Sequence, residues 1–169
     1  WLTDPNKNGA GALMDFGCYN ALWSLWYLGK PQTVYARVDH LRPDRFPKVE
    51  DNANLVLNYP HGVGIFEGSW DLPRSYQDLE VFGWADNGGS GSVYMKNGSV
   101  VVRKGRDEKK VDLTPLPEGA NEPIAYMISA IKANKPIEGL TAIDINVDVI
   151  HIIDLAKESV RTGRAVKFQ

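Results

Sequence analysis

An acidic and a phenolic side chain lie four residues apart near the start of the chain, at Asp15 and Tyr19. In a helix, residues with this spacing are neighbours on one face, and a carboxylate in the opening turns is favoured by the helix field. A carboxylate beside a phenol can orient a substrate hydroxyl and relay its proton, although a phenol with an ordinary pKa of about 10 needs a neighbouring cation to act as a base. The same spacing also fits a helix-start Asp and a Tyr at an interface.

A second set of candidate binding residues lies further along the chain. Trp70 and Asp71 end a predicted strand, where an indole can stack on a sugar ring and a carboxylate can accept its hydroxyls. An aromatic anchor at a sheet rim or a subunit contact is the alternative interpretation. Arg42 and Lys48 bound a loop with two prolines, and they are either substrate contacts or part of a solvated lid.

Two further patterns resemble cofactor or metal sites and fail on closer reading. Asp148, His151 and Asp154 recur every three residues, so they fan across a helix face and do not converge on a metal. A dinucleotide loop needs glycines between a strand and a helix. The glycines of 62–64 lie inside an alternating strand, and those of 88–91 precede neither a helix nor a lysine. We therefore expect no metal site, and no dinucleotide site within this chain.

The composition indicates one globular domain, residues 1–169, and its charge favours no particular class of binding partner. The formal net charge is −2, which gives no reason to expect nucleic acid or an anionic membrane as a partner. The single cysteine, Cys18, forms no internal disulfide and fits a reducing compartment. No apolar run approaches the roughly 20 residues that span a bilayer. We expect a cytoplasmic protein, or a periplasmic one if an export signal precedes Trp1.

Hydrophobic periodicity predicts a helix, then a run of strands, then two helices. This order is typical of an α+β fold: one mostly antiparallel open β-sheet with helices packed on one face. The last helix should bury the face that carries Ile145, Val149, Ile152, Ile153, Ala156 and Val160. The predicted helices are 8–28, 122–134 and 141–162, and the predicted strands are 33–41, 53–59, 63–70, 77–83, 92–96, 99–103 and 111–113.

With these residues identified, the chain resembles the C-terminal domain of the Gfo/Idh/MocA (glucose-fructose oxidoreductase / inositol dehydrogenase) family over essentially its whole length. Residues 9–19, GAGALMDFGCY, resemble that family's glycine-rich helix with the pattern D-x-G-x-(H/Y). The tyrosine variant and Ser69-Trp70 are most similar to the glucose-fructose oxidoreductase and dihydrodiol dehydrogenase branch. Other segments that fall where the family has them are Glu50-Asp51, 62–64, 80–83 and 158–163.

The resemblance implies a two-domain enzyme whose Rossmann domain, absent from this chain, binds NAD or NADP and supplies a catalytic lysine. Asp15 would orient the substrate hydroxyl, and Tyr19 would be the acid/base at the reacting oxygen. Hydride would pass between the substrate carbon and the nicotinamide. The substrate would be a sugar, cyclitol or related diol, and the open sheet face would form a homo-oligomer contact. The 169 residues alone should then be inactive.

One departure from the family pattern leaves a second function open. The family often has Asp or Asn three positions after the His/Tyr, where this chain has Leu22. Asn20, which we also expect near the substrate, is out of phase with that position. The alternative is therefore a non-catalytic, sugar-responsive regulator or scaffold on the same fold.

Overall fold

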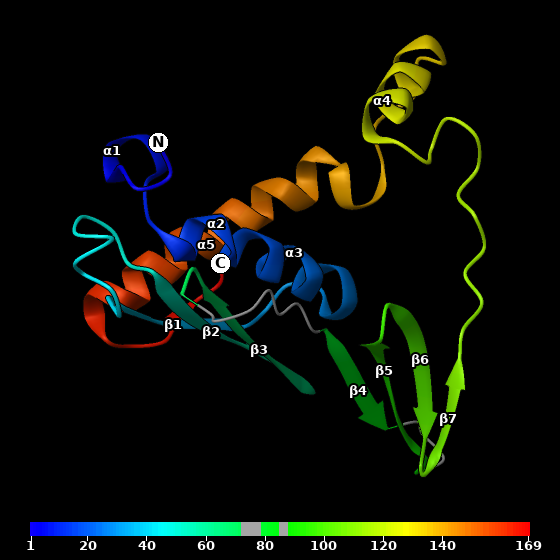
Figure 1. Cartoon of the computed structure of the whole chain (residues 1–169), viewed down its shortest axis with the longest axis horizontal. Helices are drawn as coiled ribbons and strands as arrows, with labels where there is room; N and C mark the ends of the chain where they lie inside the picture. The colour runs from blue at the N-terminus through cyan, green and yellow to red at the C-terminus, as the bar shows by residue number, and fades with distance from the viewer. Residues whose placement is uncertain (72–78, 85–87) are drawn as a thin grey trace. The chain divides into compact units, whose positions relative to one another are not determined.

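The computed structural model describes residues 1–71, 79–84 and 88–169. The chain divides into two compact units, which are described separately below. The first unit combines Trp1–Pro73 with Lys135–Gln169, and the second is Arg74–Asn134 (Figure 1).

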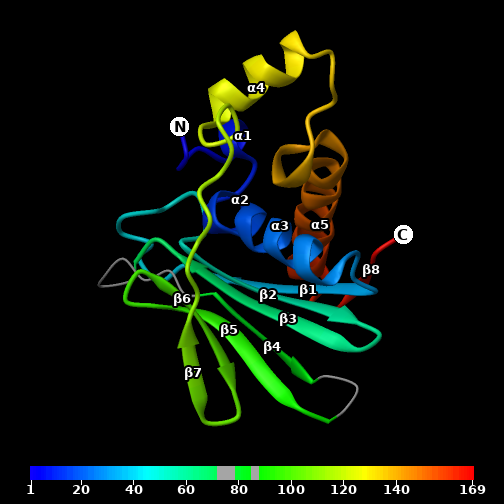
Figure 2. The ribbon, with the colours of Figure 1, turned by 90° about the vertical axis from the view of Figure 1, so that its right-hand side faces the viewer.

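The first unit is a four-stranded antiparallel sheet covered on one face by helices. Its strand order is β3-β2-β1-β8. Helices α3 and α5 lie on the same face of this sheet (Figure 2). The elements are β1 (Thr33–Asp39), β2 (Asn52–Tyr59), β3 (Gly62–Ser69), β8 (Val166–Lys167), α3 (Gly17–Leu28) and α5 (Ile143–Thr162).

The alternating pattern of β1 decides which face of this sheet is buried. Val34 and Ala36 point into the core, whereas Tyr35 and Arg37 are exposed on the other face, as the sequence predicts. The core between the sheet and the helices is formed mainly by Val34, Ala36, Leu55, Leu57, Ala21, Leu25, Ile152, Ile153 and Ala156. Burial of this apolar surface is the main stabilising term of the unit.

The first predicted helix, 8–28, is wrong as a continuous element, because the chain forms three separate helices between residues 5 and 28. These are α1 (Pro5–Asn8), α2 (Ala12–Asp15) and α3. Gly9 ends α1 with φ 81°, in the left-handed region that favours glycine. Phe16, with φ −105° and ψ −32°, separates α2 from α3. Asp15 and Tyr19 therefore flank a helix junction rather than share one uninterrupted helix.

The buried face of α5 differs from the prediction at one position. Val160 is 37% exposed, and the neighbouring Ser159 is fully buried in its place. The reason is a hydrogen bond: the backbone N–H of Ala36 donates to Ser159 Oγ over 2.9 Å. β8 pairs only with Thr33 and Val34, so Ser159 satisfies a strand donor that lies beyond the end of β8.

The second unit contains a second antiparallel sheet, with the order β4-β5-β6-β7. The α+β class is thus confirmed, with the described strands in two four-stranded sheets where the sequence predicted one. Asn97 and Gly98, which the sequence predicts as a two-residue hairpin turn between strands 92–96 and 99–103, form that turn with φ 51° and 72°. The elements are β4 (Glu80–Trp84), β5 (Ser90–Lys96), β6 (Ser99–Lys104), β7 (Asp107–Lys110) and α4 (Pro123–Lys132).

One predicted strand of this unit is not formed, and another begins outside the described residues. The predicted strand 111–113 is wrong, because the last strand of this sheet is β7, which pairs with β6 after a turn at Gly105 with φ 59°. The turn takes the residues directly after β6, so β7 ends at Lys110, and beyond it the Val111 N–H still donates to the Val100 carbonyl over 2.9 Å. The predicted start of β4 at Gln77 lies outside the described residues. No described helix combines the length and apolar character needed to cross a membrane.

Candidate active site

The glycine-rich segment before Asp15 is fixed by the backbone and side chain of Glu50. Glu50 Oε1 accepts the N–H groups of Gly11 at 2.7 Å and Leu13 at 3.1 Å, and its carbonyl accepts that of Ala12 at 3.0 Å. These are the donors that a helix N-terminus leaves unsatisfied. A Cβ on Gly11 would lie 1.9 Å from the Glu50 carbonyl oxygen, so the close approach requires glycine here.

The Asp15 carboxylate is held from the opposite side by the end of β3. Trp70 Nε1 donates to Asp15 Oδ2 over 2.8 Å. Gly68, two residues earlier, lets the strand lie against the helix junction, because a Cβ there would be 2.6 Å from Phe16 Cβ. Asp15 is half-buried and thus has one oriented oxygen at a partly open position.

Trp70 is itself held by two contacts from other elements. Its ring lies against Phe46, with the ring centroids 5.0 Å apart and the planes tilted by 55°. Its backbone N–H donates to the Asp51 carbonyl over 2.9 Å. The loop 42–48, β2 and β3 therefore meet at Trp70, which remains partly exposed.

Asp51 organises the chain that leads into the proline loop. Its carboxylate accepts the N–H groups of Leu41 at 2.7 Å and Arg42 at 2.6 Å. Burial alone would raise the pKa of Asp51, but these two hydrogen bonds and the neighbouring Asp71 carboxyl together lower it. Desolvation and the neighbouring Asp51 carboxylate raise the pKa of Asp71. The two carboxyls thus form a pair in which Asp71 is the more readily protonated.

Arg42 and Asp71, two further predicted binding residues, have charged partners in the loop 42–48. The guanidinium of Arg42 is exposed and engages Asp44 through two hydrogen bonds, at 3.1 and 3.0 Å. Asp71 Oδ1 faces Arg45 NH1 at 3.9 Å. The structure therefore brings Asp71 and the Arg42 backbone together at Asp51, while the Arg42 side chain points to its own loop partner.

Tyr19 and Asn20 begin α3 on the other side of the junction from Asp15. Tyr19 is 59% exposed. Asn20 Nδ2 is buried and has no hydrogen-bond partner among the described residues. Leu22 packs partly buried against the core.

From the sequence, Glu50 and Asp51 are recognisable only as a segment shared with the family, without a role, and Phe46 is not identified. Phe46 contacts Trp70, 24 positions away, and Glu50 binds Gly11, 39 positions away. Asp51 binds the amides of Leu41 and Arg42, ten and nine positions away. No local periodicity carries that information. One feature of the sequence could have indicated these roles: Glu and Asp stand side by side directly before a strand. Acidic residues are rarely buried unless they have hydrogen-bond partners.

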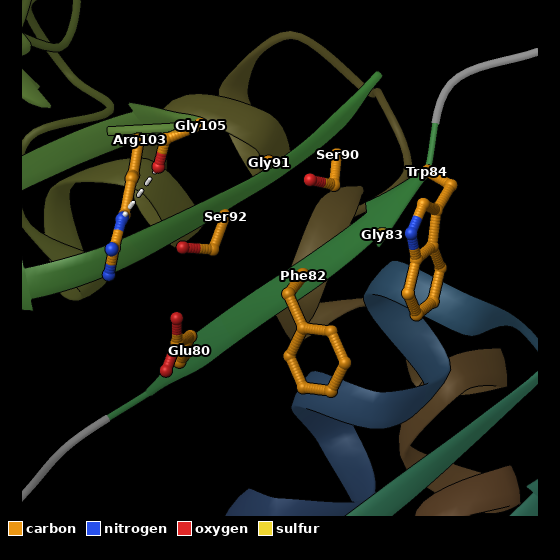
Figure 3. Close-up of a pocket in the computed structure, with 9 residues that line it drawn as sticks. All are labelled: Glu80, Phe82, Gly83, Trp84, Ser90, Gly91, Ser92, Arg103 and Gly105. Atoms are coloured by element: carbon orange, nitrogen blue, oxygen red, sulfur yellow. Dashed lines mark hydrogen bonds between the residues drawn. The ribbon is translucent and has the colours of Figure 1, made fainter. Parts of the chain in front are cut away.

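An open hollow of about 300 Å³ lies over strands β4, β5 and β6 of the second unit (Figure 3). Phe82 and Trp84 project from β4 over it, 68% and 75% exposed, with Glu80 and Arg103 on its polar side. None of the predicted site residues lines it. It is an open surface lined by both polar and apolar side chains rather than an enclosed site.

No arrangement of the described residues fits a metal ion or a dinucleotide. No group of three or more His, Cys, Asp or Glu side chains is placed to hold a metal within 1–71, 79–84 and 88–169. Gly62 and Gly64 lie inside β3, and the glycines of 88–91 lead into β5, so neither set opens a helix. A dinucleotide pyrophosphate is therefore not accommodated by these glycines.

The fold and the Asp15 site together define an α+β domain with a candidate substrate-binding junction. A family model described as the GFO/IDH/MocA C-terminal domain matches residues 1–89, which is more than half of the 169-residue chain. The chain belongs to the GFO/IDH/MocA family as its C-terminal domain, as the resemblance indicated. A search of curated proteins gives no match.

Solved structures share the fold at low sequence identity. Aldose-aldose oxidoreductase from Caulobacter crescentus, complexed with glycerol, is 22% identical with a TM-score of 0.76 and covers 99% of this chain and 50% of its own. An Agrobacterium radiobacter oxidoreductase with NAD+, L-tartaric acid and magnesium is 17% identical, with a TM-score of 0.67 and coverage of 94% and 49%. GenD2 from gentamicin A biosynthesis, in complex with NAD, is 18% identical, with a TM-score of 0.66 and coverage of 100% and 51%. The chain thus spans about half the length of the structures it matches.

Proposed function

We propose that this chain is the substrate-binding domain of an NAD(P)-dependent oxidoreductase that acts on a sugar, cyclitol or related diol. The observation that carries the proposal is the helix junction at Phe16. It has a carboxylate anchored by Trp70 over 2.8 Å on one side and the exposed Tyr19 on the other. Family membership and the fold it shares with solved oxidoreductases support the reaction class.

In this proposal the two junction residues have different tasks. Asp15 accepts a hydrogen bond from a substrate hydroxyl and orients it. Tyr19 exchanges the proton at the reacting oxygen, and a cation outside this chain makes that exchange feasible near neutral pH. Asn20, Trp70, Asp71 and Arg42 are the proposed contacts to the rest of the substrate.

The nicotinamide cofactor belongs, in this proposal, to a separate nucleotide-binding domain. The glycines of 62–64 and 88–91 open no helix among the described residues, and matched structures described with NAD are about twice as long. The family's cofactor supplies hydride chemistry when it is bound. This chain would supply the hydroxyl-orienting and proton-exchanging side chains.

We also propose a homo-oligomer contact on the sheet face of the first unit that carries no helix. Tyr35, Val63 and Ile65 are 38%, 48% and 73% exposed on that face. Apolar side chains gathered on a sheet surface are typical of an interface. Sizing of the protein in solution tests this contact, and a monomer at micromolar concentration would rule it out.

A second candidate function is a sugar-responsive regulator without redox activity. The burial of Leu22 against the core favours it, because the position where the family often has a polar residue offers no hydrogen bond here. Such a protein would bind a sugar and leave it unchanged.

The two functions are separated by experiments on the full-length protein, including whatever sequence precedes Trp1. It is titrated with NADH and NADPH while nicotinamide fluorescence is followed, and this 169-residue chain is the negative control. Aldoses, cyclitols and diols are then screened with the oxidised cofactors for a rise in nicotinamide absorbance. Saturable binding with turnover supports the oxidoreductase. Sugar binding without turnover favours the regulator, and no cofactor binding refutes the oxidoreductase.

A further inference from the structure

We propose that Trp70 is a positioning residue for Asp15: its indole N–H fixes one carboxylate oxygen so that the other faces the substrate hydroxyl. This inference rests on the proposed function, because it assigns a task to the proposed hydroxyl-orienting group. It also gives Trp70 a role other than stacking on a sugar ring.

The geometry of the Trp70–Asp15 contact fits this role. The N···O distance of 2.8 Å is that of a charge-assisted hydrogen bond. Among the described residues, no other side chain donates a hydrogen bond to the Asp15 carboxylate. Its second oxygen is therefore the acceptor that remains, on a side chain that is only partly buried.

The indole can set the orientation of Asp15 because it is itself restrained. The Phe46 ring, with its centroid 5.0 Å away, limits rotation of the indole, and the Trp70 N–H to Asp51 carbonyl bond fixes its backbone. Asp51 is fully buried and tied to the Leu41 and Arg42 amides. A restrained donor maintains the carboxylate geometry at little entropic cost during the reaction.

The restraint also connects two parts of the first unit that are distant in sequence. Asp15 ends the short helix α2, whose N-terminus depends on Glu50, and Trp70 follows the last residue of β3. A four-residue helix has little stability of its own. Its last side chain therefore needs a partner from outside, and Trp70 is the partner that the structure supplies.

The first test is spectroscopic and does not depend on activity. The full-length protein is labelled with ¹⁵N at tryptophan, and the Trp70 indole resonance is identified by its loss in Trp70→Phe. Asp15→Asn removes the anionic acceptor, so the Trp70 indole proton should move upfield, while Asp148→Asn, an acid on α5 paired with Lys30, should leave it in place. An unchanged Trp70 signal in Asp15→Asn would overturn the contact.

The second test separates the N–H donor from the ring. Trp70 is replaced by 3-benzothienylalanine, which keeps the bicyclic shape and has sulfur where the indole has N–H. The matched control is 5-fluorotryptophan, which keeps both the shape and the donor. The sulfur analogue should lower kcat about 10- to 100-fold with KM within about threefold, because a misplaced carboxylate affects the transition state more than binding. The fluorinated control should retain turnover.

The outcomes distinguish failure of this inference from failure of the proposed function. If Asp15→Ala abolishes turnover and the sulfur analogue retains it, Trp70 does not position Asp15 and the inference is refuted. If the sulfur analogue raises KM and leaves kcat unchanged, Trp70 binds substrate by contact and the inference is again refuted. If Asp15→Ala itself turns over normally, the proposed role of Asp15 fails, and with it the positioning role.

Discussion

Gly68→Ala should destabilise the protein through one identifiable contact. A Cβ at position 68 would lie 2.6 Å from Phe16 Cβ, whereas carbon atoms in contact prefer about 3.5–4.0 Å. The separation must therefore grow by roughly 1 Å. Phe16 Cβ is attached directly to the backbone, so the side chain cannot relieve the clash by rotating. Either the end of β3 or the α2–α3 junction must move.

The expected cost follows from overpacking of a well-packed interior. Such insertions lower the free energy of unfolding by about 1–3 kcal/mol. Gly62→Ala, in the same strand, is the matched control, because nothing lies within 4 Å of a Cβ there. Gly62 is the first residue of β3, and alanine is at least as favourable as glycine in a strand, so the control should be neutral or slightly stabilising.

Urea unfolding followed by tryptophan fluorescence measures both variants under the same conditions. Gly68→Ala should have a lower midpoint than the parent with an unchanged denaturant slope, and Gly62→Ala should not. Because the displaced segment carries the residues on either side of Phe16, Gly68→Ala should also reduce turnover of the full-length protein. Equal midpoints for the two variants would refute the close packing of β3 against the junction.

Three further substitutions test contacts inside the first unit. Ser159→Ala should lower the free energy of unfolding by about 1–3 kcal/mol, because the Ala36 N–H is then buried without an acceptor. Glu50→Gln should lower it by about 1–3 kcal/mol, since two hydrogen bonds to a charged acceptor become bonds to a neutral one. Asp71→Asn should reduce the pH dependence of stability: the raised pKa of Asp71 contributes stability below the ordinary value of about 4, and that stability is lost as pH rises through the folded value.

Each of these three predictions has a control and a result that would contradict it. Ser90→Ala and Glu67→Gln replace exposed residues and should change the free energy of unfolding by less than about 0.5 kcal/mol. A Ser159 or Glu50 variant that matches its control would contradict the corresponding contact. For Asp71→Asn, midpoints are compared with those of the parent between about pH 4 and 7. An unchanged dependence would show that the Asp51–Asp71 pair does not share a proton.

The sequence predicted those parts of the fold that depend on local periodicity. The alternation of β1 fixed its buried face, and the Asn97-Gly98 turn followed from the conformational preference of those two residues. The end of α5 at Gly163 was predicted for the same reason, and the structure has that residue at φ 69°. Each of these features depends on a short stretch of chain alone.

What could not be predicted depends on partners that are distant in sequence. The break at Phe16 is part of a segment set by Glu50 and Gly68, and no helical propensity reveals it. Ser159 takes the buried position assigned to Val160 because it serves a backbone donor of β1. The candidate pair Asp15 and Tyr19 was found from spacing, but the anchor of Asp15 on Trp70 required the fold.

The most direct test of the account is turnover of the full-length protein with Tyr19→Phe, and Tyr27→Phe as its control. Both tyrosines lie on α3 and are 59% and 48% exposed, so the substitutions are matched in chemistry and setting. The account predicts a loss of about 10²–10⁴ in kcat for Tyr19→Phe, typical of a missing general acid/base, and little change for Tyr27→Phe. Equal turnover in the two variants would contradict the assignment of the proton-exchanging group to Tyr19.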